Sequence, residues 1–196
     1  MSALGTYQFR DANWDWPGQA GMGGPGMSAP DLFLMDWLPA DNIRFYPTRQ
    51  GGEQTFTLRA LSRARAGQPM VVIVPIPSRQ GASQFVTVEY RQGDGWDAGF
   101  GSSPAKGAAV LVHRGNSAPS QQLSMLIENR NGGALQPCGK LIFTFDNGIV
   151  FHVTAESFNL ADGSATVSMG FGTTGKFVYC PNLTVTSPGG VVFVKP

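Results

Sequence analysis

The sequence predicts a mostly β protein: a β-sandwich of the jelly-roll or Ig-like kind, with one short helix and an irregular Gly- and Trp-rich N-terminal arm. Three observations lead to this fold class. Short apolar segments rich in β-branched and aromatic residues recur about every 8 to 12 residues. The 26 Gly and 14 Pro supply tight turns between these segments. Only one stretch has the signals of a helix, so a fold of alternating strands and helices is excluded.

The irregular arm is expected over residues 1–27, because the Gly-rich stretch GQAGMGGPGM that ends it cannot hold a helix or a strand. Its aromatic residues have two interpretations. They either anchor a loop that covers the core, or they form an aromatic cluster that binds a ligand. The candidate binding residues are Tyr7, Trp14, Trp16 and, from a later turn, Trp96.

The helix is predicted directly after the arm. Ser28 is a suitable N-cap, Pro30 fits the first turn, and Asp31 complements the positive end of the helix. Apolar side chains follow, and Pro39 is expected to end the helix near Leu38. With about ten residues, this helix must be held by packing rather than by its own propensity.

From residue 43 onward the pattern is that of strands. Asn147-Gly148 and Asp162-Gly163 lie between apolar runs and predict hairpin turns, since such pairs accept a positive φ at little cost. The expected strands are 43–46, 54–60, 70–76, 84–91, 108–113, 122–128, 139–145, 148–156, 164–169, 176–180 and 190–195.

Two stretches rich in Gly and Asn, at 115–121 and 129–133, are the expected hinges. They predict a mixed part at residues 1–118 and a β module at residues 119–196. The alternative is one continuous domain over both parts.

Composition limits the classes of partner. Charged residues make up 14% of the chain and the net charge is +1, whereas about 25% charged residues is usual in soluble domains. Neither a nucleic acid nor an anionic membrane surface is therefore an expected partner. No apolar run approaches the ~18 residues that a membrane-spanning helix needs.

Two features predict an extracellular location. Cys138 and Cys180 each lie close to the end of an expected strand and are interpreted as a disulfide pair, with two buried free thiols as the alternative. Asn182-Leu183-Thr184 is a glycosylation sequon. The N-terminus lacks the basic and apolar parts of a signal peptide. We therefore expect a fragment of a longer exported precursor.

No catalytic residue is predicted. The two histidines, His113 and His152, each continue an apolar run and are interpreted as sheet residues rather than ligands. No HExxH sequence occurs, so the chain has no helical zinc site. A GxSxG nucleophile turn is absent as well.

One turn has the composition of a metal site. Glu89, Asp94 and Asp97 bracket it, and their carboxylates are the hard oxygen ligands that calcium prefers. In the alternative interpretation Glu89 pairs with an arginine while Asp97 caps the turn. Calcium is the only cofactor that the residues themselves suggest.

Several segments resemble a known family. VVIVPIPSRQGASQFVTVEYRQGDGWDAGF, followed by AAVLVHR, is similar to a segment of secreted metzincin zinc metallopeptidases of the gametolysin and immune-inhibitor type. GPGMSAPDLFLMDWLP resembles the helix that closes their catalytic domain. Met1-Ser2-Ala3 resembles their Met-turn, in which the methionine lies beneath the zinc. The resemblance covers residues 1–114.

The resemblance implies that the chain is the C-terminal half of such a protein: the tail of a catalytic domain followed by a β module. The family's HExxHxxGxxH helix is missing, so no zinc is expected on this chain alone, and Met1 would only pack. The expected partner is an N-terminal catalytic half or a second copy. Two other hypotheses stay open: a lectin-like module that binds carbohydrate or a protein ligand, and a self-assembling structural subunit.

Overall fold

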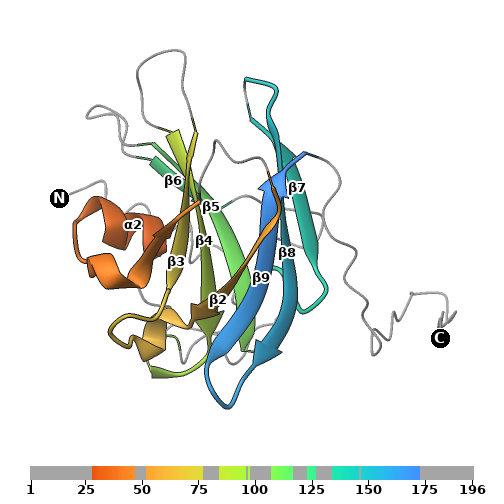
Figure 1. Cartoon of the computed structure of the whole chain (residues 1–196). Coiled ribbons are helices and arrows are strands. Elements are labelled where there is room, and N and C mark those ends of the chain that lie inside the picture. Colours follow the sequence, from red (N-terminus) through yellow and green to blue (C-terminus); the bar gives the residue numbers. More distant parts are fainter. Residues whose placement is uncertain are drawn as a thin grey trace, which may run out of the picture.

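Over its described residues, the computed structural model is a two-layer β-sandwich with one short α-helix packed on its outside (Figure 1). This confirms the predicted β-sandwich with one short helix, whereas the predicted N-terminal arm, residues 1–27, lies outside the described residues. The described residues are 28–46, 52–76, 84–95, 97, 107–116, 123–126, 134–145 and 147–172.

The elements follow in chain order from the helix to the last strand. The helix α2 is Ala29–Leu34, and two 3-10 turns are η1, Ala40–Asn42, and η2, Leu61–Arg63. The strands are β1 Ile43–Phe45, β2 Gln54–Arg59, β3 Val71–Ile76, β4 Gln84–Gln92, β5 Ala108–Asn116, β6 Leu123–Leu126, β7 Lys140–Thr144, β8 Val150–Asn159 and β9 Ser164–Phe171. Nine of the expected strands are thus confirmed, and those at 176–180 and 190–195 lie outside the described residues.

The strands form a five-stranded sheet, in the order β1-β3-β4-β5-β6, and a four-stranded sheet, in the order β2-β9-β8-β7. Strands β1 and β3 are parallel and the other pairs are antiparallel. Each sheet takes strands from both sides of residue 118, because β6 joins the first sheet and β2 joins the second. Such interleaving is the arrangement expected of one continuous domain.

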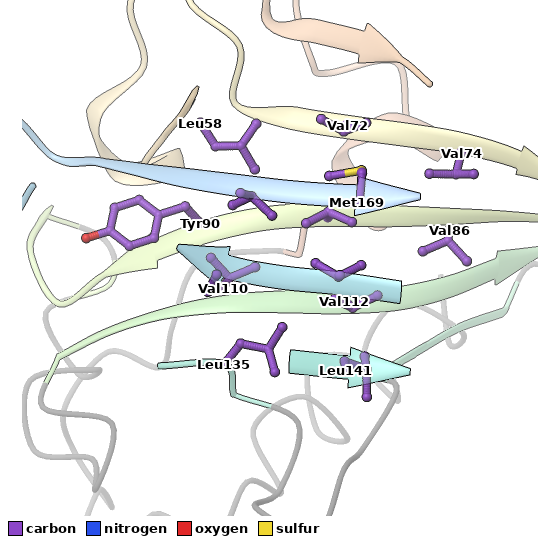
Figure 2. Close-up of a cluster of buried hydrophobic side chains, with 14 of the residues drawn as sticks. Leu58, Val72, Val74, Val86, Tyr90, Val110, Val112, Leu135, Leu141 and Met169 are labelled. Atoms are coloured by element: carbon purple, nitrogen blue, oxygen red, sulfur yellow. The ribbon is translucent and has the colours of Figure 1, made fainter. Parts of the chain in front are cut away.

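The main core lies between the two sheets (Figure 2). Alternate residues of β2, β3, β4, β5, β7, β8 and β9 point into it, as the pleat of a strand requires. The five-stranded sheet contributes chiefly valines, and the other sheet contributes Leu58, Leu141 and Met169. Tyr46 and Phe151 meet edge to face, with ring centroids 5.8 Å apart.

The five-stranded sheet is buried on its outer face as well. Val71, Ile73 and Phe85 pack there against helix α2, and the rings of Phe33 and Phe85 are 5.5 Å apart. Consequently, seven consecutive residues of β4 are buried, from Phe85 to Arg91. Polar residues on the outer side of β4 are therefore enclosed rather than solvated.

The helix is shorter than predicted and ends at Leu34 instead of near Leu38. Asp36 adopts a left-handed conformation with φ of 58°, and the Trp37 N–H donates to Leu32 O at 2.9 Å. This is a Schellman-type end, which closes the helix before Pro39 is reached. Ser28 occupies the N-cap position but makes no side-chain cap.

The Ser28 hydroxyl instead donates to the Asp31 carboxylate at 2.6 Å. Hydrogen bonds to an ionised carboxylate are stronger than those between neutral groups, which accounts for the difference from the predicted cap.

The two predicted hairpin turns are confirmed. Gly148 has φ of 81° between β7 and β8, and Gly163 has φ of 73° between β8 and β9. In the first turn the Ile149 N–H donates to the Asn147 side-chain oxygen at 3.0 Å. Gly at each of these positions readily adopts the positive φ that the reversal needs.

Candidate functional site

A group of charged side chains is buried on the outer face of the five-stranded sheet, beside helix α2. Glu89 and Arg91 alternate along β4 with Val88 and Tyr90, which face the core, so the two charges point away from it. His113 joins them from β5. We name this group the Arg91 cluster; its members are Glu89, Arg91, Asp97 and His113. The side chains of all four are at most 3% exposed.

Arg91 lies at the centre of the cluster. Its Nε donates to Asp97 Oδ2 at 2.8 Å, and one terminal nitrogen donates to the other oxygen of the same carboxylate. This fork geometry is the strongest form of an arginine–carboxylate pair. The other terminal nitrogen lies 3.5 Å from Glu89 Oε2. A single guanidinium therefore compensates two buried carboxylates.

Glu89 connects the cluster to the helix and to the neighbouring strand. Its Oε2 accepts the Ala29 N–H at 3.0 Å, and its Oε1 lies 3.3 Å from His113 Nδ1. The Ala29 N–H belongs to the first turn of α2, where backbone donors have no partner within the helix. Protonation of His113 would turn its contact with Glu89 into an ion pair. Glu89 thus fixes the start of α2 on the sheet.

The enclosure of the Arg91 cluster limits its chemistry. Taking an ion out of water costs several kcal/mol, and the cost is offset only when the partners are well aligned and hydrogen-bonded. Arg91 and Asp97 meet that condition. With so little exposed surface, these carboxylates and the imidazole do not reach a dissolved substrate. The arrangement is suited to holding α2 on the sheet rather than to catalysis.

Asp94 belongs to a different contact. It accepts the Ser62 hydroxyl and the Arg63 Nε, each at 2.5 Å, and its side chain is 27% exposed. These partners come from η2, which precedes β3. Asp94 therefore ties that turn to the end of β4.

The three residues of the predicted calcium site are each paired with an arginine: Glu89 and Asp97 share Arg91, and Asp94 contacts Arg63. The pairing of Glu89 with an arginine is the alternative given above. Within the described part of the chain, no group of three His, Cys, Asp or Glu side chains is arranged to hold a metal ion. Calcium binding stays a prediction.

Sequence reasoning did not assign Arg91 and His113 to this cluster, although one signal was present. Glu89 and Arg91 are two residues apart in a strand, so they share a face. Placing His113 near them required the register of β4 and β5, which pairs Thr87 with His113 and Glu89 with Leu111.

Tyr90 lies on the opposite side of β4, in the main core. Burial, followed by the nearby negative charge of Asp94, raises its pKa to about 12, while Arg63 acts in the opposite direction. Its hydroxyl donates to Gln92 Oε1 at 3.2 Å. Tyr90 is therefore neutral at physiological pH and serves the packing between the sheets.

The two histidines lie in strands, as predicted. His113 is in β5 and His152 is in β8, so they belong to different sheets. Both are buried, and His152 Nδ1 lies 3.0 Å from Gly172 O. Gly170 is the cross-strand neighbour of His152, and a Cβ at residue 170 would come within 3.1 Å of the imidazole. This ring is part of the sheet's packing.

Several predicted site residues lie outside the described residues: Met1, Tyr7, Trp14, Trp16, Trp96 and Cys180. Cys138 is in the turn before β7, with φ of 70°, and its N–H donates to Ala155 O at 2.6 Å. The disulfide between Cys138 and Cys180 stays a prediction.

Fold and site together define a β-sandwich whose one described α-helix is fixed to the outer sheet face by an enclosed ionic network. No family model, no curated protein and no solved structure matches the chain. Within the described residues, no helix is both long and apolar enough to cross a membrane.

Proposed function

We propose that this chain is a noncatalytic, extracellular β-rich portion of a zinc-metallopeptidase-like protein, with a structural role. In this role the sandwich supports helix α2, which by the resemblance would be the end of the catalytic domain. The metal-binding half would then be a separate, upstream part of the protein. The chain itself carries no reaction.

The Arg91 cluster is the observation that carries this proposal. Ala29 belongs to the helix segment of the resemblance, Glu89 and Arg91 to the Glu-Tyr-Arg segment, Asp97 to Gly-Trp-Asp, and His113 to the segment AAVLVHR. These stretches are separated in sequence, yet their charged and capping groups meet in one network. A shared structural task gives a reason for such stretches to occur together, and the task is to fix the helix.

Exposed aromatic residues beside α2 support the same proposal. Trp37 is 65% exposed just after the helix, and Phe45 is 59% exposed in the edge strand β1. Large apolar side chains on a surface often mark a contact with a partner. In this proposal the partner is the N-terminal catalytic half, with a second copy of the chain as the alternative.

Metal analysis of the purified chain, beside a protease assay with added zinc, tests the proposal. We expect no stoichiometric zinc and no cleavage that a chelator abolishes. A catalytic zinc needs three protein ligands and one open position, and the two histidines of this chain lie in separate sheets. Calcium alone in the analysis would direct attention to Glu89, Asp94 and Asp97.

Stoichiometric zinc with chelator-sensitive cleavage would overturn the proposal. The zinc content of His113→Gln would then be compared with that of His152→Gln. The variant that has lost a zinc ligand should bind less zinc than the other. A second, independent observation is the coding sequence directly upstream. An in-frame HExxH motif there supports the proposal, and a complete unrelated domain contradicts it.

A further inference from the structure

A small pocket lined by charged, polar and apolar groups lies at the end of the four-stranded sheet, away from the Arg91 cluster. Its volume is about 240 Å³. The pocket is lined by Thr57 and Arg59 of β2, Gln68 and Pro69 before β3, Asp162 of the β8–β9 turn and Ser164 at the start of β9. We name it the Arg59 pocket.

Hydrogen bonds between the walls fix the shape of the pocket. Arg59 and Ser164 are cross-strand partners in the β2–β9 ladder. The Arg59 N–H donates to Pro69 O at 2.7 Å, and the Asn42 side chain donates to Gln68 O at 2.6 Å. The walls are thus tied to regular structure, as in a site that is formed before its ligand arrives.

The two charged side chains that line the Arg59 pocket have opposite signs. Arg59 is buried, and its terminal nitrogen lies 2.5 Å from the carboxylate of Asp162, which is 48% exposed. The hydrogen bond from Arg59, and then that from the Ser164 hydroxyl, lowers the pKa of Asp162. The pair presents one cation and one anion side by side. A ligand of either net charge meets one like and one opposite charge there, so the pair gives little net attraction to an anion or to a cation.

The remaining groups match a ligand with several hydroxyls. A hydroxyl both donates and accepts, so one that bridges Asp162 and Arg59 satisfies an acceptor and a donor together. Gln68 and Thr57 carry an amide and a hydroxyl that also do both. The Arg59 Nε is buried without a hydrogen-bond partner, which leaves donor capacity on this side chain.

We propose that the Arg59 pocket binds a single neutral sugar ring, held by its hydroxyls between Arg59 and Asp162. The volume is below the ~300–1,000 Å³ of sites for drug-sized ligands, so one ring is accommodated rather than an oligosaccharide. Thr57 and Asp162 are exposed, so the rest of a glycan chain extends into solvent. This site does not rest on the metallopeptidase proposal, and it involves none of the aromatic residues predicted to bind a ligand.

Amide chemical-shift titration with methyl glycosides of glucose, galactose and mannose tests the proposal. At least one of them is expected to give saturable shifts at the amides of Thr57 and Ser164. With one small ring, the dissociation constant should be about millimolar. Sodium glucuronate and inorganic phosphate are titrated in parallel, and neither is expected to saturate these amides.

Three variants sharpen the test. Asp162→Asn replaces an acceptor oxygen by a donor and should weaken binding about tenfold. Thr57→Ile removes a hydroxyl and adds bulk at the rim, with a similar expected loss. Thr55→Ile is the matched control, since residue 55 is exposed on the same face of β2 but does not line the pocket. It should bind as the unmodified chain does, and thermal melting checks that all three fold.

Three results would overturn the proposal. The first is the absence of saturable shifts with any neutral glycoside up to tens of millimolar. The second is saturation by glucuronate or phosphate instead, which would assign an anion site. The third is binding of a neutral glycoside that is unchanged in both Asp162→Asn and Thr57→Ile, which would place the sugar elsewhere on the molecule.

Discussion

Two arginine–carboxylate arrangements lie on different sheets of this sandwich and differ in their access to water. Arg91 and Asp97 are 3% and 2% exposed, and Glu89 adds a second enclosed carboxylate. Arg59 is 5% exposed, but its partner Asp162 is 48% exposed. Both pair a guanidinium with a carboxylate, but the Arg91 pair is enclosed and forked, whereas the Arg59 pair is open on its carboxylate side. The first can hold the fold together, and the second is available to a ligand.

The reason for the difference lies in what covers each sheet. Helix α2 packs on the outer face of the five-stranded sheet, and its Ala29 N–H enters the ionic network directly. At the Arg59 pocket, the carboxylate comes from the β8–β9 turn, and turns lie at the surface. Enclosure by a second layer therefore converts an ion pair from a surface contact into a structural element.

The largest expected effect is that of Arg91→Met. The substitution keeps an unbranched side chain but leaves Glu89 and Asp97 buried without their cation, which typically costs about 3–5 kcal/mol. Urea unfolding measures the free energy of unfolding. Arg63→Met is the matched control, because Arg63 pairs with Asp94 at a site that is partly open to solvent. That control should lose at most about 1 kcal/mol.

Equal losses in Arg91→Met and Arg63→Met would contradict the distinction between enclosed and open pairs. A variant too unstable to purify is still informative, provided that the Arg63→Met control folds normally. In that case urea unfolding is measured on the milder variant Asp97→Asn instead. The urea midpoint of Asp97→Asn should lie well below that of Asp94→Asn.

An intermediate effect is expected from alkaline titration of Tyr90, on the core side of β4. Its pKa is raised to about 12 from 10.0, first by burial and then by Asp94. Below pH 10 the folded and unfolded chains both keep the proton, so stability is not affected. Between about pH 10 and 12 the unfolded chain ionises while the folded chain does not, so stability falls as pH rises through this window.

The ultraviolet absorbance of tyrosinate follows this ionisation. The chain has 4 tyrosines, and Tyr90→Phe should remove a late component of the titration curve while leaving the earlier ones in place. A curve that loses an early component in Tyr90→Phe would show that water reaches this hydroxyl, and hence that the core side of β4 is open.

The fold was accessible from the sequence because its signals are local. Gly at 148 and 163 marked the reversals, and nine expected strands are present. The end of the helix was predicted too late, since Asp36 takes a left-handed conformation for which aspartate gives only a weak signal. Pairings between distant segments carry no local signal at all. Arg59 and Asp162 illustrate this, because only the register of β2 with β9 brings them together.

The smallest expected effect belongs to the open pair. The hydrogen bonds from Arg59 and then from Ser164 lower the pKa of Asp162 below its usual value of 3.8. Stability from a lowered carboxyl pKa is present above the unfolded value and is lost as pH falls through the folded one. Asp162→Asn should therefore lower the urea midpoint slightly at neutral pH. The difference from the unmodified chain should shrink only below about pH 4.

Carboxyl carbon chemical shifts measure the pKa of Asp162 directly, with the exposed Asp41 as the internal comparison. A pKa of 3.8 or higher for Asp162 would mean that water separates it from Arg59. The charges of the Arg59 pocket would then no longer be paired, and the pocket would no longer favour a neutral ligand. A lowered pKa keeps the two groups paired in solution, as the recognition of a bridging hydroxyl requires.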